Sequence, residues 1–382
     1  MTQKPAGIEV RVCPEMKAVA REDWNALDGV SEAPFLSWEF LDAMERTGCV
    51  GEGTGWSPAH LTFYEKDQLI GAAPAYLKDN SEGEFVFDYA WADALRRAGR
   101  RYYPKIIVAS PFTPATGSRA LVRRPEDRPR VVAAIAETLR ALAKRMDLSS
   151  AHVLFPNESE ASLFEGAGLA RRFGVQFQWR NKGYATWEDF LASFDSKRRA
   201  MLRRERREVQ KQGLTIETLS GSSITPEVVD RMFAFYLSTV QKFFWGRQYL
   251  NRAFFEEIVK VLSGKVEIVI ARDGAKAIAG AFNLVGPTAL FGRYWGATEE
   301  RPFLHFNVCY YHSVEEAIAR KLERFEPGAG GSHKRSRGFD PTITESVHHL
   351  VHPGLDHAVR DFLNREREAI REHVEKGDVD ED

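Results

Sequence analysis

Two distant segments of this chain follow the same plan, and this repetition constrains the fold more than any other feature. Residues 60–79 read HLTFYEKDQLIGAAPAYLKD, and residues 266–286 read VEIVIARDGAKAIAGAFNLVG. Each segment has an apolar strand, a charged turn and a second strand with adjoining small residues. An internal duplication is the economical explanation. The pattern therefore predicts two similar α/β units in tandem.

The length of the chain supports a division into two. A chain of 382 residues exceeds the usual size of one hydrophobic core. We expect an N-terminal domain over residues 1–180, a C-terminal domain over 181–375 with a basic helix at 196–212, and an acidic, disordered tail at 376–382. Strands and helices alternate in both halves. The clearest of them are expected at 105–109, 127–146, 151–155, 158–166, 289–297, 307–321 and 324–326.

Charge and cysteine content exclude several protein classes. The formal net charge is −1, which argues against a surface devoted as a whole to nucleic acid. The three cysteines, Cys13, Cys49 and Cys309, show no CxxC spacing, so neither a disulfide framework nor a zinc ribbon is indicated. The first residues lack the apolar core of a secretion signal, and no run approaches the length of a membrane span. We expect a cytoplasmic protein without a transmembrane segment.

One segment between the halves is strongly cationic. The helix expected at 196–212 carries eight Lys or Arg side chains, which are Lys197, Arg198, Arg199, Arg203, Arg204, Arg206, Arg207 and Lys211. Such a patch attracts the phosphates of RNA, a nucleotide or anionic lipid. A solvated helix face is the alternative, because long cationic side chains are also good helix formers. We take Arg203, Arg204 and Arg207 as candidates for binding a phosphate-bearing donor.

The chemically densest stretch runs from Leu304 to Thr342. Asn307 is expected to cap a helix, and a short strand at 324–326 follows it. Gly328, Gly330 and Gly331 then allow backbone angles closed to other residues, so that amide N–H groups can approach a ligand. His333, Lys334 and Arg337 come directly after this loop. The order predicts a helix, a strand and a ligand-binding loop.

Other polar groups are weaker candidates. Residues 81–119 mix aromatic, proline and charged residues, which fits a functional surface loop or ordinary packing around a strand, and Asp88 and Trp91 are its candidate binding residues. The histidines near the C-terminus are expected to be structural, since strand alternation separates neighbours, and no metal site is predicted; they are His348, His349 and His352. Cys309 lies among apolar helix positions and is expected to be a core thiol.

Several strings, in this order along the chain, resemble a known family. They are PFLSWEFLDAMERTG, FDYAWADA, YYPK, PFTPATGSR, GRYWG, LHFNVCYY and GAGGSHKRSRGF. The chain closely resembles the FemAB-like N-acyltransferases, also described as peptidoglycan biosynthesis or recognition proteins, from about Trp24 to Glu368. It departs from the family pattern at three positions. Asn307 stands where an acidic residue is usual, and Gly330 and Ser332 stand where GAQGEHK would place Gln and Glu.

The resemblance implies an α/β protein of two tandem GNAT-like domains with mixed sheets, similar to ligases that move amino acids from aminoacyl-tRNA onto cell-wall peptides. The expected activity is transfer of an aminoacyl or acyl group onto an amine acceptor, either a peptide or a small molecule. No cofactor is expected to be bound permanently. Aminoacyl-tRNA is the favoured co-substrate and acyl-CoA the second, because the Q/R-x-x-G-x-G/A loop of CoA-dependent acetyltransferases is not evident. The departures favour a different alternative, a non-catalytic binder of peptidoglycan-type peptides.

Acyl transfer to an amine needs a base, donors for the oxyanion and a grip on the carrier's phosphates. The base candidates are His333 and His305. The oxyanion donors are the backbone N–H groups of residues 328–331 together with Tyr294, and the phosphate grip is Lys334 with Arg337. Arg293 and Trp295, which flank Tyr294, are expected opposite the glycine loop.

Overall fold

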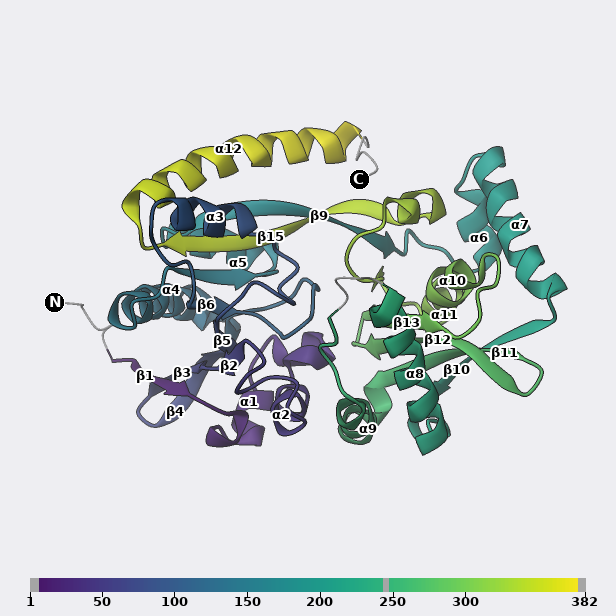
Figure 1. The fold of residues 1–382 in the computed structure, drawn as a ribbon, viewed down its shortest axis with the longest axis horizontal. Helices are drawn as coiled ribbons and strands as arrows, with labels where there is room; N and C mark the ends of the chain where they lie inside the picture. The colour runs from purple at the N-terminus through teal and green to yellow at the C-terminus, as the bar shows by residue number, and fades with distance from the viewer. Residues whose placement is uncertain (1–6, 243–246, 377–382) are drawn as a thin grey trace. The chain divides into compact units, whose positions relative to one another are not determined.

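The computed structural model describes residues 7–242 and 247–376, which fall into two compact units. Unit 1 contains the described residues up to 175 together with those from 343 onward, and unit 2 contains residues 176–342. Each unit has its own hydrophobic core. Figure 1 labels the helices and strands of both.

Unit 1 holds two groups of paired strands. One sheet has the order β1-β3-β4-β7, and the other strands follow the order β15-β8-β6-β5-β2. The strands are β1 (Glu9–Cys13), β2 (Trp56–Pro58), β3 (His60–Glu65), β4 (Gln68–Ala73), β5 (Ala75–Lys78), β6 (Lys105–Val108), β7 (Leu121–Val122), β8 (Ser150–Leu154) and β15 (Asp340–Leu350). The helices are α1 (Arg21–Asn25), α2 (Trp38–Arg46), α3 (Tyr89–Arg97), α4 (Arg128–Arg145), α5 (Glu158–Gly166) and α12 (Pro353–Lys376).

Local sequence explains much of unit 1. The side chain of Ser37 accepts a hydrogen bond from the amide of Phe40 and so caps α2. Pro74 separates β4 from β5, because proline has no N–H group to donate to a neighbouring strand. Val131, Ile135 and Leu139 recur at steps of four along α4 and are fully buried against the strands.

Unit 2 also combines a row of paired strands with helices. Its strands follow the order β10-β11-β12-β13-β14-β9. They are β10 (Leu214–Ser220), β11 (Val266–Asp273), β12 (Lys276–Val285), β13 (Ala289–Ala297), β14 (Arg324–Glu326) and β9 (Ala170–Arg180), of which residues 176–180 belong to unit 2. The helices are α6 (Trp187–Ala192), α7 (Ser196–Lys211), α8 (Pro226–Lys242), α9 (Arg252–Val261), α10 (Leu304–Phe306) and α11 (His312–Ala319), with a π-helical segment, Asn307–Tyr311, joining α10 to α11.

Both units have a parallel pair of strands at the same place in the order. β6 pairs in parallel with β8 in unit 1, and β13 pairs in parallel with β14 in unit 2, whereas β11 and β12 form an antiparallel hairpin as β3 and β4 do. A helical segment stands between the two parallel strands in each case, α4 in unit 1 and 304–319 in unit 2. The expected α/β class with mixed sheets is confirmed.

The strand partners place the division of the chain differently from the sequence prediction. The predicted C-terminal domain runs from 181 to 375, but residues from 343 onward belong to unit 1. The reason is that β15 pairs with β8 from Ser346↔Leu154 to Leu350↔Ser150, and α12 buries Val359 and Leu363 with Trp91 of α3. β9 pairs with β14 through Arg180 and Trp179. Residues 377–382 of the predicted tail lie outside the described residues.

One open alternative is decided and one prediction is corrected. Of the two interpretations of segment 81–119, ordinary packing around a strand agrees with the structure, because the segment contains α3 and β6 and buries Glu84 and Lys105. The helix expected to begin with a cap at Asn307 begins instead at Leu304. Asn307 lies inside it, where its side-chain amide donates to the carbonyls of Phe303 at 3.0 Å and Glu205 at 3.2 Å.

Candidate active site in unit 2

The glycine loop after β14 takes the backbone angles that the sequence predicts. Gly328, Gly330 and Gly331 have φ values of +88°, +69° and +84°, in the left-handed region that glycine favours. At Gly331 a Cβ would also lie 2.8 Å from Cε1 of His333. A short helical segment, Ser332–Arg337, follows. The loop therefore presents His333 in close contact with its own backbone.

His333 lies among aromatic rings from the helical segment 304–311. Its Nε2 is 3.0 Å from the hydroxyl of Tyr310, and its ring centroid is 5.6 Å from that of Phe306 and 6.0 Å from that of His305. His333 is exposed, whereas Tyr310 is buried. Burial raises the pKa of Tyr310, so its hydroxyl stays protonated at neutral pH. The structure thus gives His333 a fixed neutral partner and access to solvent.

Both candidate bases are neutral at pH 7. Burial, together with the neighbouring charges of His333 and Lys334, lowers the pKa of His305 to about 4. The pKa of His333 is also lowered, by burial first and then by the cations of Arg337 and Lys334. An imidazole with a pKa of about 4 is a weak base at neutral pH. Between the two, the exposed His333 is the better placed to accept a proton.

Lys334 ties the glycine loop together from inside. Its side chain is buried, and its Nζ donates to the carbonyl oxygens of Gly328 at 2.8 Å and Ala329 at 3.4 Å. Burial lowers its pKa to about 8. An ammonium group has three N–H donors, and these two carbonyls use two of them. Lys334 is therefore a buried cation close to its neutralisation point at physiological pH.

Arg337 is held by an internal ion pair with Glu205 of α7. Its Nε and Nη2 donate to the Glu205 carboxylate at 3.2 and 2.8 Å, and its Nη1 donates to the carbonyl of His333 at 2.8 Å. The guanidinium also lies 3.4 Å over the ring of Phe306, and the hydroxyl of Tyr311 donates to Glu205. Arg337 is thus engaged within the unit, and it positions the His333 backbone.

Sequence reasoning did not identify Glu205, although a signal for it was present. Glu205 lies between Leu202 and Val209 on the buried stripe of α7, and all three are less than 4% exposed. A carboxylate at a core position of an amphipathic helix needs a buried cationic partner. That partner comes from a segment 132 residues away.

Strand β13 sends its candidate residues to different faces. Trp295 lies 5.0 Å from the ring of His305, so it faces the helical segment 304–311. Tyr294 packs with Tyr236 of α8 and Phe282 of β12, at 5.1 and 6.3 Å. Neighbouring residues on a strand point to opposite faces. The structure therefore brings Trp295 to the histidines and places Tyr294 on the other face of the sheet. Arg293 has its guanidinium 5.6 Å from the Tyr294 ring.

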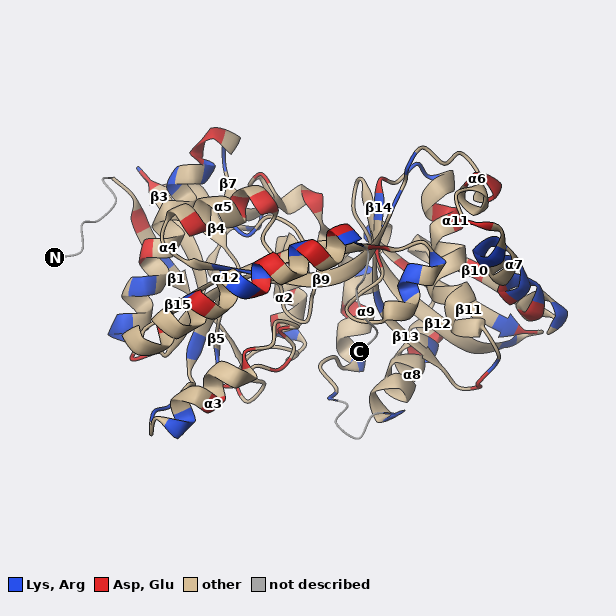
Figure 2. Ribbon diagram, turned by 90° about the horizontal axis from the view of Figure 1, so that it is seen from above, with Lys and Arg blue, Asp and Glu red and all other residues tan. Residues whose placement is uncertain are grey.

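Helix α7 is rich in Lys and Arg, which are the blue segments of Figure 2, and Arg203, Arg204 and Arg207 are exposed. Arg203 pairs with Glu188 at 2.6 Å, and Arg204 lies 5.8 Å from the ring of Phe303. Arg207 is exposed and makes no ion pair within the described residues. Acidic side chains neutralise four of the eight cations of the predicted patch, which are Arg198, Arg203, Arg206 and Lys211.

Asp88 and Trp91 belong to unit 1, in a buried polar cluster. Lys105 donates to Asp88, and to Glu84 at 2.8 Å, while the Tyr102 hydroxyl donates to Asp88 at 2.6 Å. Burial raises the pKa of Glu84 to about 7; it would also raise that of Asp88, but the Lys105 charge lowers it overall. Asp88 is 3% exposed, and its carboxylate is hydrogen-bonded inside this cluster.

The histidines near the C-terminus also join unit 1. His348 is buried, its Nδ1 lies 2.7 Å from Nδ1 of His152, and its ring is 4.9 Å from that of Trp91. Within residues 7–242 and 247–376, no cluster of three or more His, Cys, Asp or Glu side chains is arranged for a metal ion. The same ranges contain no helix that is both long and apolar enough to cross a bilayer.

Comparisons with known proteins agree with this architecture. The structure is similar to that of FemX, with a TM-score of 0.52 and 9% identity over 90% of this chain and 98% of that chain. It is also similar to L-PGS from Bacillus licheniformis, with a TM-score of 0.50 and 10% identity over 84% of this chain and 95% of that one. A tandem GNAT protein from the clavulanic acid biosynthesis pathway gives a TM-score of 0.48 and 13% identity, over 91% and 99% of the two chains. For FemX and L-PGS, at these identities, the similarity shows a shared fold and nothing more.

No curated protein matches the sequence significantly. The family model for FemAB-like proteins, described as peptidoglycan biosynthesis/recognition, matches residues 15–380. That range includes both units and every candidate residue discussed above. The chain therefore belongs to the FemAB-like family, and it shares its fold with FemX.

Proposed function

We propose that this protein is an N-acyltransferase, which moves an aminoacyl or acyl group from an ester or thioester carrier onto an amine. The observation that carries the proposal is the arrangement around His333. This exposed histidine is hydrogen-bonded to a protonated tyrosine and follows a glycine loop that a buried lysine holds. Acyl transfer requires a neutral base and a nearby cation, and this arrangement supplies both.

In the proposed reaction, the amine nitrogen attacks the carbonyl carbon of the donor and gives up a proton to His333. A neutral imidazole that donates from Nε2 to the Tyr310 oxygen keeps the lone pair of Nδ1 available for that proton. A C–N bond forms, and the carbonyl oxygen becomes an oxyanion. The carbon–oxygen or carbon–sulfur bond of the carrier then breaks, and the departing group takes the proton back from the imidazolium.

Lys334 is the proposed cation for the oxyanion. Two of its three N–H donors hold the carbonyls of Gly328 and Ala329, and the third remains to donate to the developing charge. A covalent intermediate is not required, because an amine attacks an ester or thioester directly. Burial raises the pKa of Cys309, which disfavours the thiolate that a cysteine nucleophile would need.

The exposed arginines of α7 support a carrier that contains phosphate, and aminoacyl-tRNA is the favoured donor. Arg207 and Arg204 are exposed cations on one helix of unit 2, the unit that holds His333. RNA offers a regular row of phosphates to such a helix, whereas acyl-CoA offers only a few. The family description favours an amine of a peptidoglycan-type peptide as the acceptor.

A direct transfer assay tests the proposal. The purified protein is incubated with a mixture of charged tRNAs or with acyl-CoA, and peptides that carry a free side-chain amine are added. We expect amide product and amine-dependent deacylation with charged tRNA. If product forms only with acyl-CoA, the donor is acyl-CoA instead of aminoacyl-tRNA, and the proposed transfer reaction still holds. Binding of the peptide without product from either donor would instead identify a non-catalytic peptide binder.

A further inference from the structure

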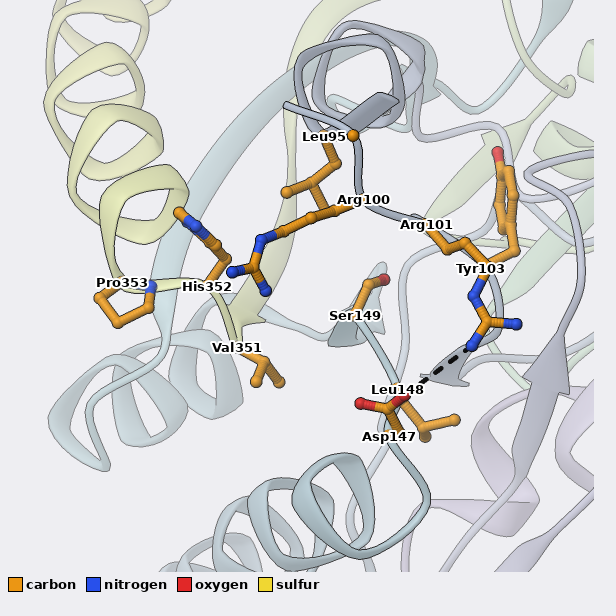
Figure 3. Close-up of a pocket in the computed structure, with 11 residues that line it drawn as sticks. Leu95, Arg100, Arg101, Tyr103, Asp147, Leu148, Ser149, Val351, His352 and Pro353 are labelled. Atoms are coloured by element: carbon orange, nitrogen blue, oxygen red, sulfur yellow. Dashed lines mark ion pairs between the residues drawn. The ribbon is translucent and has the colours of Figure 1, made fainter. Parts of the chain in front are cut away.

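Three segments of unit 1 line a cavity of about 460 Å³. The residues proposed for transfer belong to unit 2. The three segments are the end of α3 with the loop after it, the loop between α4 and β8, and the junction of β15 with α12. The walls include Leu95, Arg100, Arg101, Leu148, Val351 and His352 (Figure 3). The volume is in the range of cavities that bind small molecules.

Backbone hydrogen bonds fix the segments to one another. The amide of Arg100 donates to the Leu95 carbonyl at 2.9 Å and closes the end of α3. The amide of Val351 donates to the Ser149 carbonyl at 2.9 Å, and the amide of Ser149 donates to the carbonyl of Pro104 at 3.1 Å. All three segments are therefore joined by main-chain bonds, and the cavity is preformed.

Two arginines bring positive charge to the cavity, and Asp147 is the carboxylate among its lining residues. The guanidinium of Arg100 extends toward His352 (Figure 3) and makes no hydrogen bond or ion pair with any residue that the structure describes. Arg101 pairs only loosely with Asp147, at 3.9 Å, and the two side chains are 84% and 96% exposed. A pair this long and exposed contributes little, so Arg101 is available to a ligand.

His352 adds a ring N–H donor. Its Nδ1 accepts a hydrogen bond from the amide of Leu355 at 3.2 Å, which leaves the ring proton on Nε2. The amide of Asp356 donates to the His352 carbonyl at 2.9 Å. These two amides in the first turn of α12 already donate hydrogen bonds within the protein. The side chains that line the cavity, and not these amides, are therefore the donors for an anion.

We infer that this cavity binds the phosphate group of a small molecule or of a lipid head group. Two guanidinium groups and an imidazole N–H offer more donors than a carboxylate can use, and arginine matches phosphate oxygens in pairs. Leu95, Leu148 and Val351 give the ligand an apolar wall, and Val351 is 42% exposed at the opening. The inference does not depend on the transfer reaction, since it concerns a different unit and different residues.

The test compares two variants that lose the same charge. Arg100→Ala/Arg101→Ala removes the cations of the cavity. Arg96→Ala/Arg97→Ala removes two exposed arginines from the end of the same helix that do not line it, and serves as the control. Binding of glycerol 3-phosphate is measured by calorimetry. Binding to phosphatidylcholine vesicles, with and without phosphatidic acid, is measured by sedimentation.

We expect the wild type and the control to bind at least one probe, and the cavity variant to bind it at least about tenfold more weakly, as the loss of charged hydrogen bonds implies. Binding of glycerol 3-phosphate would identify a soluble ligand, and binding of phosphatidic acid vesicles alone would identify a lipid. Equal weakening in both variants would show a diffuse charge effect and overturn the site. Failure of the wild type to bind either probe would also overturn it.

Discussion

Replacing His333 with alanine should lower the rate of transfer and remove one limb of its pH dependence. His333 can accept a proton only when its ring is neutral. Burial and the cations of Arg337 and Lys334 lower its pKa below the ordinary value of 6.5. As the pH falls through this lowered pKa the ring binds a proton, so the wild-type rate should fall on the acid side, below pH 6.5.

The alkaline side of the profile should report Lys334. Its pKa is lowered to about 8, so the ammonium loses its proton as the pH rises through that value, and the oxyanion loses its cation. Wild-type transfer should therefore follow a bell-shaped curve. Lys334→Arg keeps a charge at all accessible pH values, and the alkaline limb near pH 8 should disappear in this variant even if the larger side chain lowers the rate.

The size of the His333→Ala effect follows from its role. General-base catalysis contributes roughly 10²- to 10⁴-fold to a rate, so the loss should be well outside experimental error. The side chain is exposed, and its removal should change the free energy of unfolding by less than about 0.5 kcal/mol. Loss of rate without loss of stability would separate a chemical role from a structural one.

The assay measures amide product at saturating donor from pH 5.5 to 9, a range that spans about one unit or more on either side of free imidazole. The same acceptor is used for every variant, so that titration of its own amine cancels. Cys309→Ala is the control, because burial raises the pKa of this thiol and it should not take part. His305→Ala should keep the acid limb of the curve, since the pKa of His305 is about 4. A full-rate His333→Ala enzyme with an unchanged acid limb would refute the assignment and transfer the role to His305 or to the acceptor.

Three further outcomes are expected. Glu205→Gln leaves the buried guanidinium of Arg337 without its ion pair and should lower the free energy of unfolding in urea by about 3–5 kcal/mol; a loss below about 1 kcal/mol would contradict a buried pair. Gly331→Ala should lower both the free energy of unfolding and the rate, because the added Cβ would lie 2.8 Å from the His333 ring. Gly330→Ala has nothing within 4 Å of its Cβ and should lower the free energy of unfolding only by the roughly 1–2 kcal/mol that alanine costs in a left-handed conformation. Equal rates in the two variants would disprove the contact. Charge reversal at three exposed positions of α7 should weaken binding of charged tRNA and reduce the dependence of that binding on salt; the positions are Arg203, Arg204 and Arg207. Binding that does not depend on salt would show that this face of the helix is only solvated.

Local sequence was sufficient for many elements of the fold. The predicted helix at 158–166 and the predicted strands at 289–297 and 324–326 agree with α5, β13 and β14. Asn251 caps α9 by accepting from the amide of Phe254, as its position before an apolar periodic segment indicates. The glycines after β14 have positive φ values. These features depend on residues a few positions apart, so a single stretch of sequence contains their cause.

The arrangement of the candidate site could not be predicted from local sequence alone. The prediction that His333 follows a ligand-binding loop came from the glycines, but its partner Tyr310 is 23 residues away along the chain and was not identified. Lys334 and Arg337 were expected to hold phosphates. The structure shows each of them bound to acceptors inside the unit, because a buried cation must find such acceptors wherever the chain brings them.

The sequence alone therefore determined the alternation of helices and strands, the doubling of the α/β plan and the family. Which strand β15 joins, which face of β13 carries Trp295, and which cation neutralises Glu205 were decided only by the tertiary structure. The physical reason is the range of the forces involved. Periodicity and capping act between neighbours in the chain, whereas strand pairing and the burial of charge are favourable only when a complementary group from a distant segment lies within hydrogen-bonding distance.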